Sequence, residues 1–329
     1  MLARLFALPL ALSMLASTSA SAQGYQVMRS DDPGYGAMQR KIEASDRGWA
    51  QVSRRYLRQP DIDRCDPGQL RPELSEEFLA RLNALRRHHG LSPVRLAHEY
   101  DREMAETALI MAANSQLSHF PGPNWRCHST AGATGAGTSN LAGGGNSQWL
   151  LWGDEDAMLG DWMREHGSTS IGHRRWLLDP FLSQVSYGRV SAVGRGGERQ
   201  DAAALKVFGF SGQDGPAPAL PPFVAYPFGD YPAQYFAPGD RMSLSVVASD
   251  RGSFASSRVD YSSAQVHAWC NERPLRVHSL RYDNEGFGLA NVIEWRAEGI
   301  LPDTRCVVKV SGVRGAPQDE YAWSFRSRS

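Results

Sequence analysis

The stretch GQDGPAPALPP, from Gly212 to Pro222, constrains the fold of this 329-residue chain more than any other. It contains four prolines and two glycines. Proline removes a backbone amide donor, and the two residue types together exclude a regular helix or strand. Helical periods precede the stretch, and short alternating runs follow it. We therefore predict two domains joined by a proline-rich linker over 213–222.

Residues 223–329, after the linker, have the pattern of an all-β domain. Apolar and polar residues alternate over short runs, and turns rich in Gly, Asp and Asn separate these runs. Cys270 ends one run and Cys306 opens another, which predicts a disulfide between the two sheets of an immunoglobulin-like β-sandwich. The runs begin at Met242, Val266, Asn291, Arg305 and Tyr321.

Amphipathic helices are predicted before the linker. In the first, Ser75 is a suitable N-cap and Gly90 ends the helix. A second helix is expected over 98–115 and a third over 155–166. A further helical pattern over 35–57 precedes them and belongs to an N-terminal extension.

Two strands are predicted over 185–193 and 204–212, joined by a polar turn. Because helices and strands interleave, the domain over 74–212 is expected to be layered α/β. Between Cys127 and Trp149 the sequence is dense in glycine, which predicts a loop. This loop lacks the glycine and lysine spacing of a phosphate-binding motif.

The N-terminus has the features of a secretory signal peptide over 1–22. Arg4 precedes an apolar run from Leu5 to Leu15, and small residues follow up to the expected cleavage point. The mature chain then starts with the N-terminal extension over 23–73, and no later segment has the ~20 consecutive apolar residues of a membrane helix. We predict a secreted or periplasmic protein without a transmembrane segment.

The net charge argues against nucleic acid as a partner, and the cysteine content indicates an oxidising compartment. Basic and acidic residues number 35 each, so the formal net charge is zero and no overall field attracts nucleic acid. Four cysteines in an exported chain favour disulfides over metal thiolates. Because each pair lies on one side of the linker, we predict the disulfides Cys65–Cys127 and Cys270–Cys306.

Several catalytic motifs occur only in incomplete form. HEYDR at His98 lacks the second histidine of a zinc-binding helix, and GFSGQ around Ser211 lacks the final glycine of a nucleophile elbow. In the β-rich part, His267 and His278 lie in or beside strand runs without a partner motif, and we interpret both as structural or surface residues.

An ordered set of motifs between Leu74 and Gly212 resembles the CAP superfamily. This superfamily includes cysteine-rich secretory proteins, antigen 5, plant pathogenesis-related proteins and bacterial SCP-like extracellular proteins. Each motif is weak alone, and the resemblance lies in their order. The motifs are ARLNALRRHHGLSPVRLAHE, LSH, TSNLAGG, WMRE, IGHRRWLLDP and a late strand with Gly188.

The resemblance implies an α-β-α sandwich with a cleft open to solvent. Carried over to this chain, the cleft histidines are His119 and His173, and one cleft glutamate is Glu165. Ser139 stands where the family has the glutamate of its G-E-N motif, and Asn140 matches the asparagine. Histidines of some relatives bind zinc, but with one carboxylate missing we predict at most a weakly bound divalent metal such as zinc at His119 and His173.

The residues around His173 receive structural interpretations. We interpret His166 as structural or surface, because a positive charge suits the C-terminus of a helix. Of Arg174 and Arg175, one is expected to pair with an acid such as Asp179 or Glu165, and the other to be solvated.

For function, the resemblance implies a binding module whose cleft engages an extracellular or envelope ligand, a lipid or a protein. The alternative is a hydrolase in which His119 or His173 acts as general base, with Glu165 orienting it and a metal or Ser139 assisting. A third class is a structural adhesin based on the β-sandwich. Enzyme activity is left open at this point, and no catalytic residue is assigned.

Overall fold

The computed structural model describes residues 34–211 and 220–328. The predicted signal peptide (1–22) and most of the predicted linker (213–219) lie outside the described residues, so the domain boundary at the linker stays a prediction. By its internal contacts the chain divides at Ile42, and Glu43–Ser329 form the larger compact unit. Within the two described ranges, no helix is both long and apolar enough to cross a lipid bilayer.

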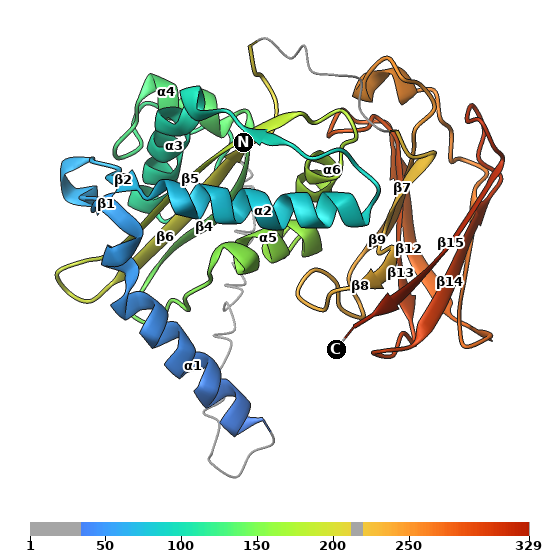
Figure 1. The fold of residues 1–329 in the computed structure, drawn as a ribbon, viewed down its shortest axis with the longest axis horizontal. Helices are drawn as coiled ribbons and strands as arrows, with labels where there is room; N and C mark the ends of the chain where they lie inside the picture. Colours follow the sequence, from blue (N-terminus) through green and yellow to red (C-terminus); the bar gives the residue numbers. More distant parts are fainter. Residues whose placement is uncertain (1–33, 212–219, 329) are drawn as a thin grey trace, which may run out of the picture. The chain divides into compact units, whose positions relative to one another are not determined.

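The described helices and strands are labelled in Figure 1. The helices are α1 (Tyr35–Ala50), α2 (Pro72–His88), α3 (Asp101–Asn114), α4 (Thr130–Ala136), α5 (Glu155–Arg164) and α6 (Gly172–Leu177). The strands before the predicted linker are β1 (Tyr56–Arg58), β2 (Gln69–Leu70), β3 (Arg95–Leu96), β4 (Ser139–Ser147), β5 (Gln184–Val193) and β6 (Arg199–Lys206). Those after it are β7 (Phe223–Tyr226), β8 (Gly229–Tyr231), β9 (Met242–Val246), β10 (Gln265–Cys270), β11 (Arg273–Pro274), β12 (Arg276–Asp283), β13 (Val292–Glu298), β14 (Arg305–Ser311) and β15 (Glu320–Ser327).

A four-stranded sheet in the order β3-β5-β6-β4 lies between two helical layers (Figure 1). Side chains alternate between the faces of a strand, and β5 follows this rule. Tyr187 stacks on Phe78 of α2 at 4.6 Å between ring centroids, on the face that also carries α5. Val190 belongs to the opposite face and packs with Met104 of α3. The predicted mixed α/β arrangement is confirmed.

The glycine-dense stretch predicted to be a loop forms α4 and β4 instead. Ser129 caps α4 by accepting a hydrogen bond from the Gly132 amide at 3.0 Å. A Cβ atom on Gly132 would lie 2.6 Å from Ile110 Cδ1, and one on Gly135 would lie 2.3 Å from Thr107 Oγ1. These glycines therefore let α4 approach α3 closely. The loop prediction was wrong because it attributed glycine density to irregular structure rather than to close packing.

Several element boundaries also differ from the sequence prediction. The first helix begins at Pro72, a favoured residue for the first helical position, so Ser75 is buried within α2 and is not its N-cap. Gly90 adopts a φ of +70° just beyond α2 and ends the helix as predicted. β6 begins at Arg199, inside the predicted polar turn, and ends at Lys206 rather than at residue 212.

A buried ion network joins β5, β6 and α5. The Arg189 guanidinium donates to both carboxylate oxygens of Asp201, at 2.9 and 2.7 Å, and to Glu155 at 3.2 Å. It also lies 4.5 Å from the centre of the Trp152 ring. Glu155 forms a second ion pair with Arg55, which lies in the short helical turn before β1. The N-terminal extension is thus linked electrostatically to the sheet.

The part after the predicted linker forms a five-stranded sheet, β11-β10-β14-β15-β8, and a four-stranded sheet, β12-β13-β9-β7. Trp295 of β13 contacts Trp323 of β15 at 6.0 Å between ring centroids, so side chains of the two sheets pack together. The Cys270–Cys306 pairing is confirmed, but it joins the neighbouring strands β10 and β14 rather than two sheets. The two cysteines lie directly opposite each other with Cα atoms 4.0 Å apart. The immunoglobulin-like topology stays a prediction.

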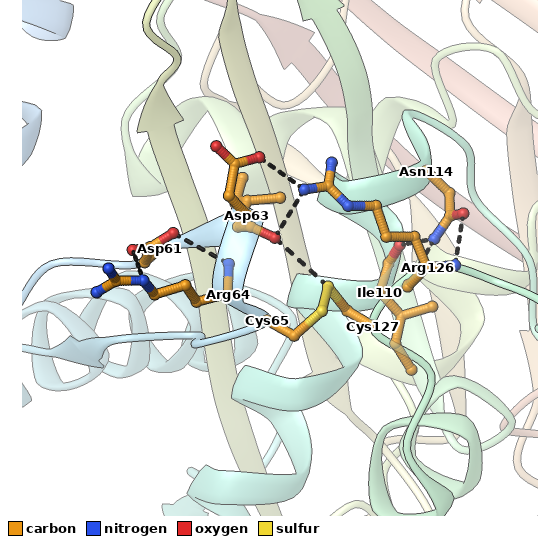
Figure 2. Close-up of a disulfide and its surroundings, with 9 residues drawn as sticks. Asp61, Asp63, Arg64, Cys65, Ile110, Asn114, Arg126 and Cys127 are labelled. Atoms are coloured by element: carbon orange, nitrogen blue, oxygen red, sulfur yellow. Dashed lines mark hydrogen bonds and ion pairs between the residues drawn. A yellow bond between two sulfur atoms is a disulfide. The ribbon is translucent and has the colours of Figure 1, made fainter.

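The Cys65–Cys127 pairing is also confirmed (Figure 2). This disulfide joins the segment between β1 and β2 to the loop between α3 and α4. Figure 2 shows Arg126 and Asp63 beside it. The Arg126 guanidinium donates to the Ile62 carbonyl at 3.1 Å and pairs with Asp63 at 2.7 Å. The covalent bond and the ion pair together hold the segment around Asp63 and Cys65 against the loop that follows α3.

His89, at the end of α2, connects this helix to the β-rich part. Its Nε2 atom lies 2.9 Å from the Tyr231 hydroxyl, and the side chain is buried. Burial, aided by repulsion from His88 and Arg174, lowers the pKa of His89 to about 3. The folded chain therefore holds this imidazole neutral.

Acid is expected to destabilise the chain through His89. The unfolded chain protonates this histidine near its ordinary pKa of about 6.5, so the stability that depends on the neutral ring is complete above that pH and is lost as the pH falls toward 3. The difference in free energy of unfolding between the chain and His89→Gln should shrink by about 1.4 kcal/mol per pH unit below pH 6. Urea titrations at several pH values measure this, and a pH-independent difference would contradict it.

Gly188 of β5 is expected to be intolerant of a side chain. A Cβ atom there would lie 2.4 Å from the backbone carbonyl carbon of Met104, where α3 crosses the sheet. Gly188→Ala should lower the free energy of unfolding by about 1–3 kcal/mol, as overpacking does. Gly137→Ala is the matched control, because its Cβ atom would come no closer than 3.5 Å to another residue. Equal losses in the two variants would show that helix approach is not the cause.

Candidate functional site

The turn between α5 and α6 brings two residues of the implied cleft together. α5 ends at Arg164, and Glu165 adopts the left-handed conformation with φ 57°. The chain reverses through Gly167, also at positive φ, and reaches α6 at Gly172. Glu165 and His173, eight positions apart in the sequence, therefore lie in contact.

Glu165 and His173 form an oriented carboxylate–imidazole pair. His173 Nδ1 lies 2.7 Å from Glu165 Oε2, and Glu165 Oε1 accepts the Arg174 amide at 2.9 Å. The Glu165 side chain is 3% exposed and that of His173 is 24% exposed. We assign the proton to Nδ1 from this hydrogen bond, which leaves a lone pair on Nε2. Among the described residues Nε2 has no hydrogen-bond partner, so it is the atom of the pair that a ligand can reach.

The two neighbouring residues Ser139 and Asn140 point to opposite faces of β4. Asn140 Nδ2 donates to the His173 carbonyl at 3.1 Å and so ties β4 to α6. Ser139 is buried on the other face, where its hydroxyl donates to the Gly135 carbonyl at 2.6 Å and lies 3.2 Å from Met104 Sδ. The structure therefore places Asn140 beside His173, and directs Ser139 into the packing of α3 and α4.

His119 lies on the loop after α3 and is exposed. Its Nδ1 atom donates to the Ala136 carbonyl at 2.7 Å, so this histidine is held near the start of β4. In the described part of the chain, no hydrogen bond or ion pair joins His119 to His173. The link between them is indirect. His119 contacts Ala136, just before β4, and His173 contacts Asn140, in β4.

The described residues do not assemble a metal site. Residues 34–211 and 220–328 contain no group of three or more His, Cys, Asp or Glu side chains placed to hold a metal ion. Glu165 uses both oxygens on protein donors, and Ser139 contributes no carboxylate. A zinc site with closed coordination needs four ligands, so this arrangement does not fit a tightly bound ion.

Arg174 and Arg175 are both buried, so the prediction that one of them is solvated was wrong. The Arg174 guanidinium lies 3.8 Å from the centre of the Tyr226 ring and donates to the Arg241 carbonyl at 3.1 Å. Arg175 pairs with Asp283 at 2.8 Å rather than with Asp179 or Glu165. Sequence reasoning missed these contacts because each partner lies more than 50 residues away, beyond any local motif.

His166 and the main groove of the described residues lie apart from the Glu165–His173 pair. His166 Nδ1 lies 2.8 Å from Asp161 Oδ1 in the last turn of α5, so its contact is with the helix and not with His173. A groove of about 1170 Å³ lies along α3 and β5, and its lining includes neither His119 nor His173.

Comparison with known proteins identifies one part of the chain. Residues 79–197 match the model of the CAP family, described as the cysteine-rich secretory protein family. The match covers the segment from α2 to the end of β5, including Glu165, His173 and Asn140. No curated protein and no solved structure matches the chain.

The carboxylate of Glu165 is expected to set the tautomer of His173. Replacing it with an amide in Glu165→Gln removes the acceptor preference for Nδ1–H, so the Nε2–H form of His173 should become substantially populated. ¹⁵N chemical shifts of the imidazole nitrogens report this directly. Asp161→Asn is the matched control, because Asp161 makes the equivalent contact with His166. Unchanged His173 shifts in Glu165→Gln would contradict the assigned pair.

Proposed function

Because residues 79–197 form a CAP domain, we propose that this chain is an exported binding protein whose site is centred on His173. The oriented Glu165–His173 pair is the observation that supports it. Its imidazole is fixed in one tautomer, and its outer nitrogen is an acceptor without a protein partner among the described residues. Such an atom can receive a hydrogen bond from the polar group of a ligand.

An apolar side chain next to His119 suggests the character of the ligand. Phe120 follows His119 directly in the sequence and is 88% exposed. Binding sites commonly combine apolar side chains with a few polar groups that orient the ligand. We infer that the ligand combines an apolar part with a polar group, as an envelope lipid or an apolar protein segment does.

Export is supported by two observations. The chain holds both predicted disulfides, which form and persist in oxidising compartments. No free cysteine remains among the described residues. Together with the signal-peptide pattern over 1–22, these observations favour a secreted or periplasmic location.

A hydrolase is the second candidate, and the same pair favours it. A carboxylate that orients an imidazole is the arrangement of a general base. The hydroxyl proposed to assist, Ser139, donates instead to the Gly135 carbonyl on the opposite face of β4. Since general-base catalysis also requires a nucleophile within reach, the binding function is the better supported of the two.

Ligand extraction tests the binding function. The chain and His173→Ala are purified from the native host, and bound organic molecules are extracted and weighed by mass spectrometry. We expect a ligand that accompanies the unaltered chain and is at least tenfold depleted from His173→Ala. His166→Ala is the matched control, because His166 is exposed and contacts only α5. Equal ligand content in all three proteins would overturn the proposal.

Zinc binding is expected to be weak. Two imidazoles without a third ligand give an incomplete site, so calorimetry should show a dissociation constant no tighter than micromolar, weakened further in His119→Ala or His173→Ala. Hydrolysis of labelled casein should be the same for the chain and for His173→Ala. Nanomolar zinc binding, or casein hydrolysis that depends on His173, would favour the hydrolase instead.

A further inference from the structure

One edge of β5 is only partly paired. Near its start, the Ala97 amide after β3 donates to the Val185 carbonyl at 2.8 Å. Farther along the same edge, the Tyr56 hydroxyl donates to the Arg189 carbonyl at 3.2 Å and accepts the Ser191 amide at 2.8 Å. Between these contacts β5 has a neighbouring strand, β6, on the other side only.

In an antiparallel pair of strands, successive residues point their backbone N–H and C=O groups alternately toward and away from the partner strand. This rule identifies the backbone groups of β5 that have no partner. Because the Arg189 carbonyl and the Ser191 amide point away from β6, the N–H and C=O of Tyr187 and the N–H of Arg189 must do the same. These three groups have no hydrogen-bond partner among the described residues. Tyr187 and Arg189 are 2% and 1% exposed, and buried backbone groups are rarely left unpaired. The edge thus lacks a partner at this place.

The same part of β5 belongs to the lining of the groove of about 1170 Å³. Tyr187, Gly188 and Arg189 belong to its lining, together with the start of α2 and the first half of α3. The segment from β1 to β2 and the Cys65–Cys127 disulfide line it as well. Figure 2 shows this disulfide beside the α3 residue Ile110. Since α2 and α3 cover opposite faces of the sheet, the groove lies where a further strand beside β5 would lie.

The lining favours a ligand recognised through its main chain. Two small side chains, Ser75 of α2 and Ala105 of α3, leave space beside the unpaired groups. Charged side chains of the lining pair with one another, Arg58 with Asp66 and Arg102 with Glu106, and His98 Nδ1 lies 2.9 Å from Asp101 Oδ2. This balance gives no attraction for a polyanion such as nucleic acid.

We propose that this groove binds a segment of another polypeptide in extended conformation, with uncharged side chains, which pairs with Tyr187 and Arg189 as an added strand. Strand addition supplies affinity through main-chain hydrogen bonds and places alternate side chains of the ligand toward α2 and α3. The site is separate from the Glu165–His173 pair, so this proposal stands or falls independently of the proposed function.

Hydrogen exchange followed by NMR tests the proposal on the full chain. The probe is a library of capped hexapeptides containing only Ala, Ser, Thr and Val. At millimolar peptide we expect the Tyr187 and Arg189 amides to exchange at least tenfold more slowly. The intervening Gly188 amide, which already faces β6, should change little. Equal rates with and without peptide for Tyr187 and Arg189 would overturn the proposal.

Two matched variants and a modified peptide locate the binding. Ala105→Phe fills the groove and should weaken binding of a selected library peptide at least tenfold, whereas Ala80→Phe, at an exposed position of α2 outside the groove, should not. N-methylation of successive peptide residues should abolish binding at alternate positions only. If N-methylation weakened binding equally at every peptide position, or if Ala105→Phe and Ala80→Phe had equal effects, strand addition would be contradicted.

The Tyr187 and Arg189 amides could also become protected without peptide as the protein concentration rises. This result would show that a second copy of this chain occupies the groove, and it would overturn the proposal.

Discussion

Arg189 provides the contact on which much of the N-terminal half depends. Its guanidinium is fully buried, and it joins β5 to Asp201 of β6 and to Glu155 at the start of α5. Taking charged groups out of water is costly unless each is paired and hydrogen-bonded, and losing one partner of such a network costs about 3–5 kcal/mol. Here every charge has an opposite partner, and Glu155 also pairs with Arg55. The network therefore fixes α5, the sheet and the turn that carries Arg55 in one arrangement.

The candidate site inherits its geometry from this arrangement. Once the start of α5 is fixed at Glu155, the length of the helix determines where Glu165 ends it and turns toward α6. Glu165 then orients His173, and the adjacent Arg174 and Arg175 anchor α6 to the β-rich part. The His173 imidazole is thus positioned by Glu165 before it in the sequence and by Arg174 and Arg175 after it. A rigidly placed acceptor of this kind loses little conformational freedom when a ligand binds.

The groove beside β5 depends on the same constraints. The Arg55–Glu155 pair and the Cys65–Cys127 disulfide hold the segment from Arg55 to Cys65 near the sheet, and no strand of this segment pairs with β5. The Tyr56 hydroxyl satisfies part of the edge, and the remaining groups of Tyr187 and Arg189 face the groove. Tyr56 therefore covers part of this edge. Unprotected edges tend to promote aggregation, so a covered edge of limited length is also favourable for solubility.

The sequence by itself determined the features that depend on local patterns. Apolar periods located α2, α3 and α5, and alternating runs located β9, β10, β13, β14 and β15 but not β7, β8, β11 or β12. Motif order identified the segment that matches the CAP family model. Tertiary structure alone decided the features that join distant residues. The glycines at 132 and 135 serve helix contact, which only the position of α3 explains. The burial of Arg174 and Arg175 depends on partners more than 50 residues away. The side of the sheet that Ser139 faces follows from strand pairing, and the partly paired edge of β5 follows from strand order. Periodicity records which face of an element is apolar, whereas the neighbour that covers that face is set by packing over the whole chain.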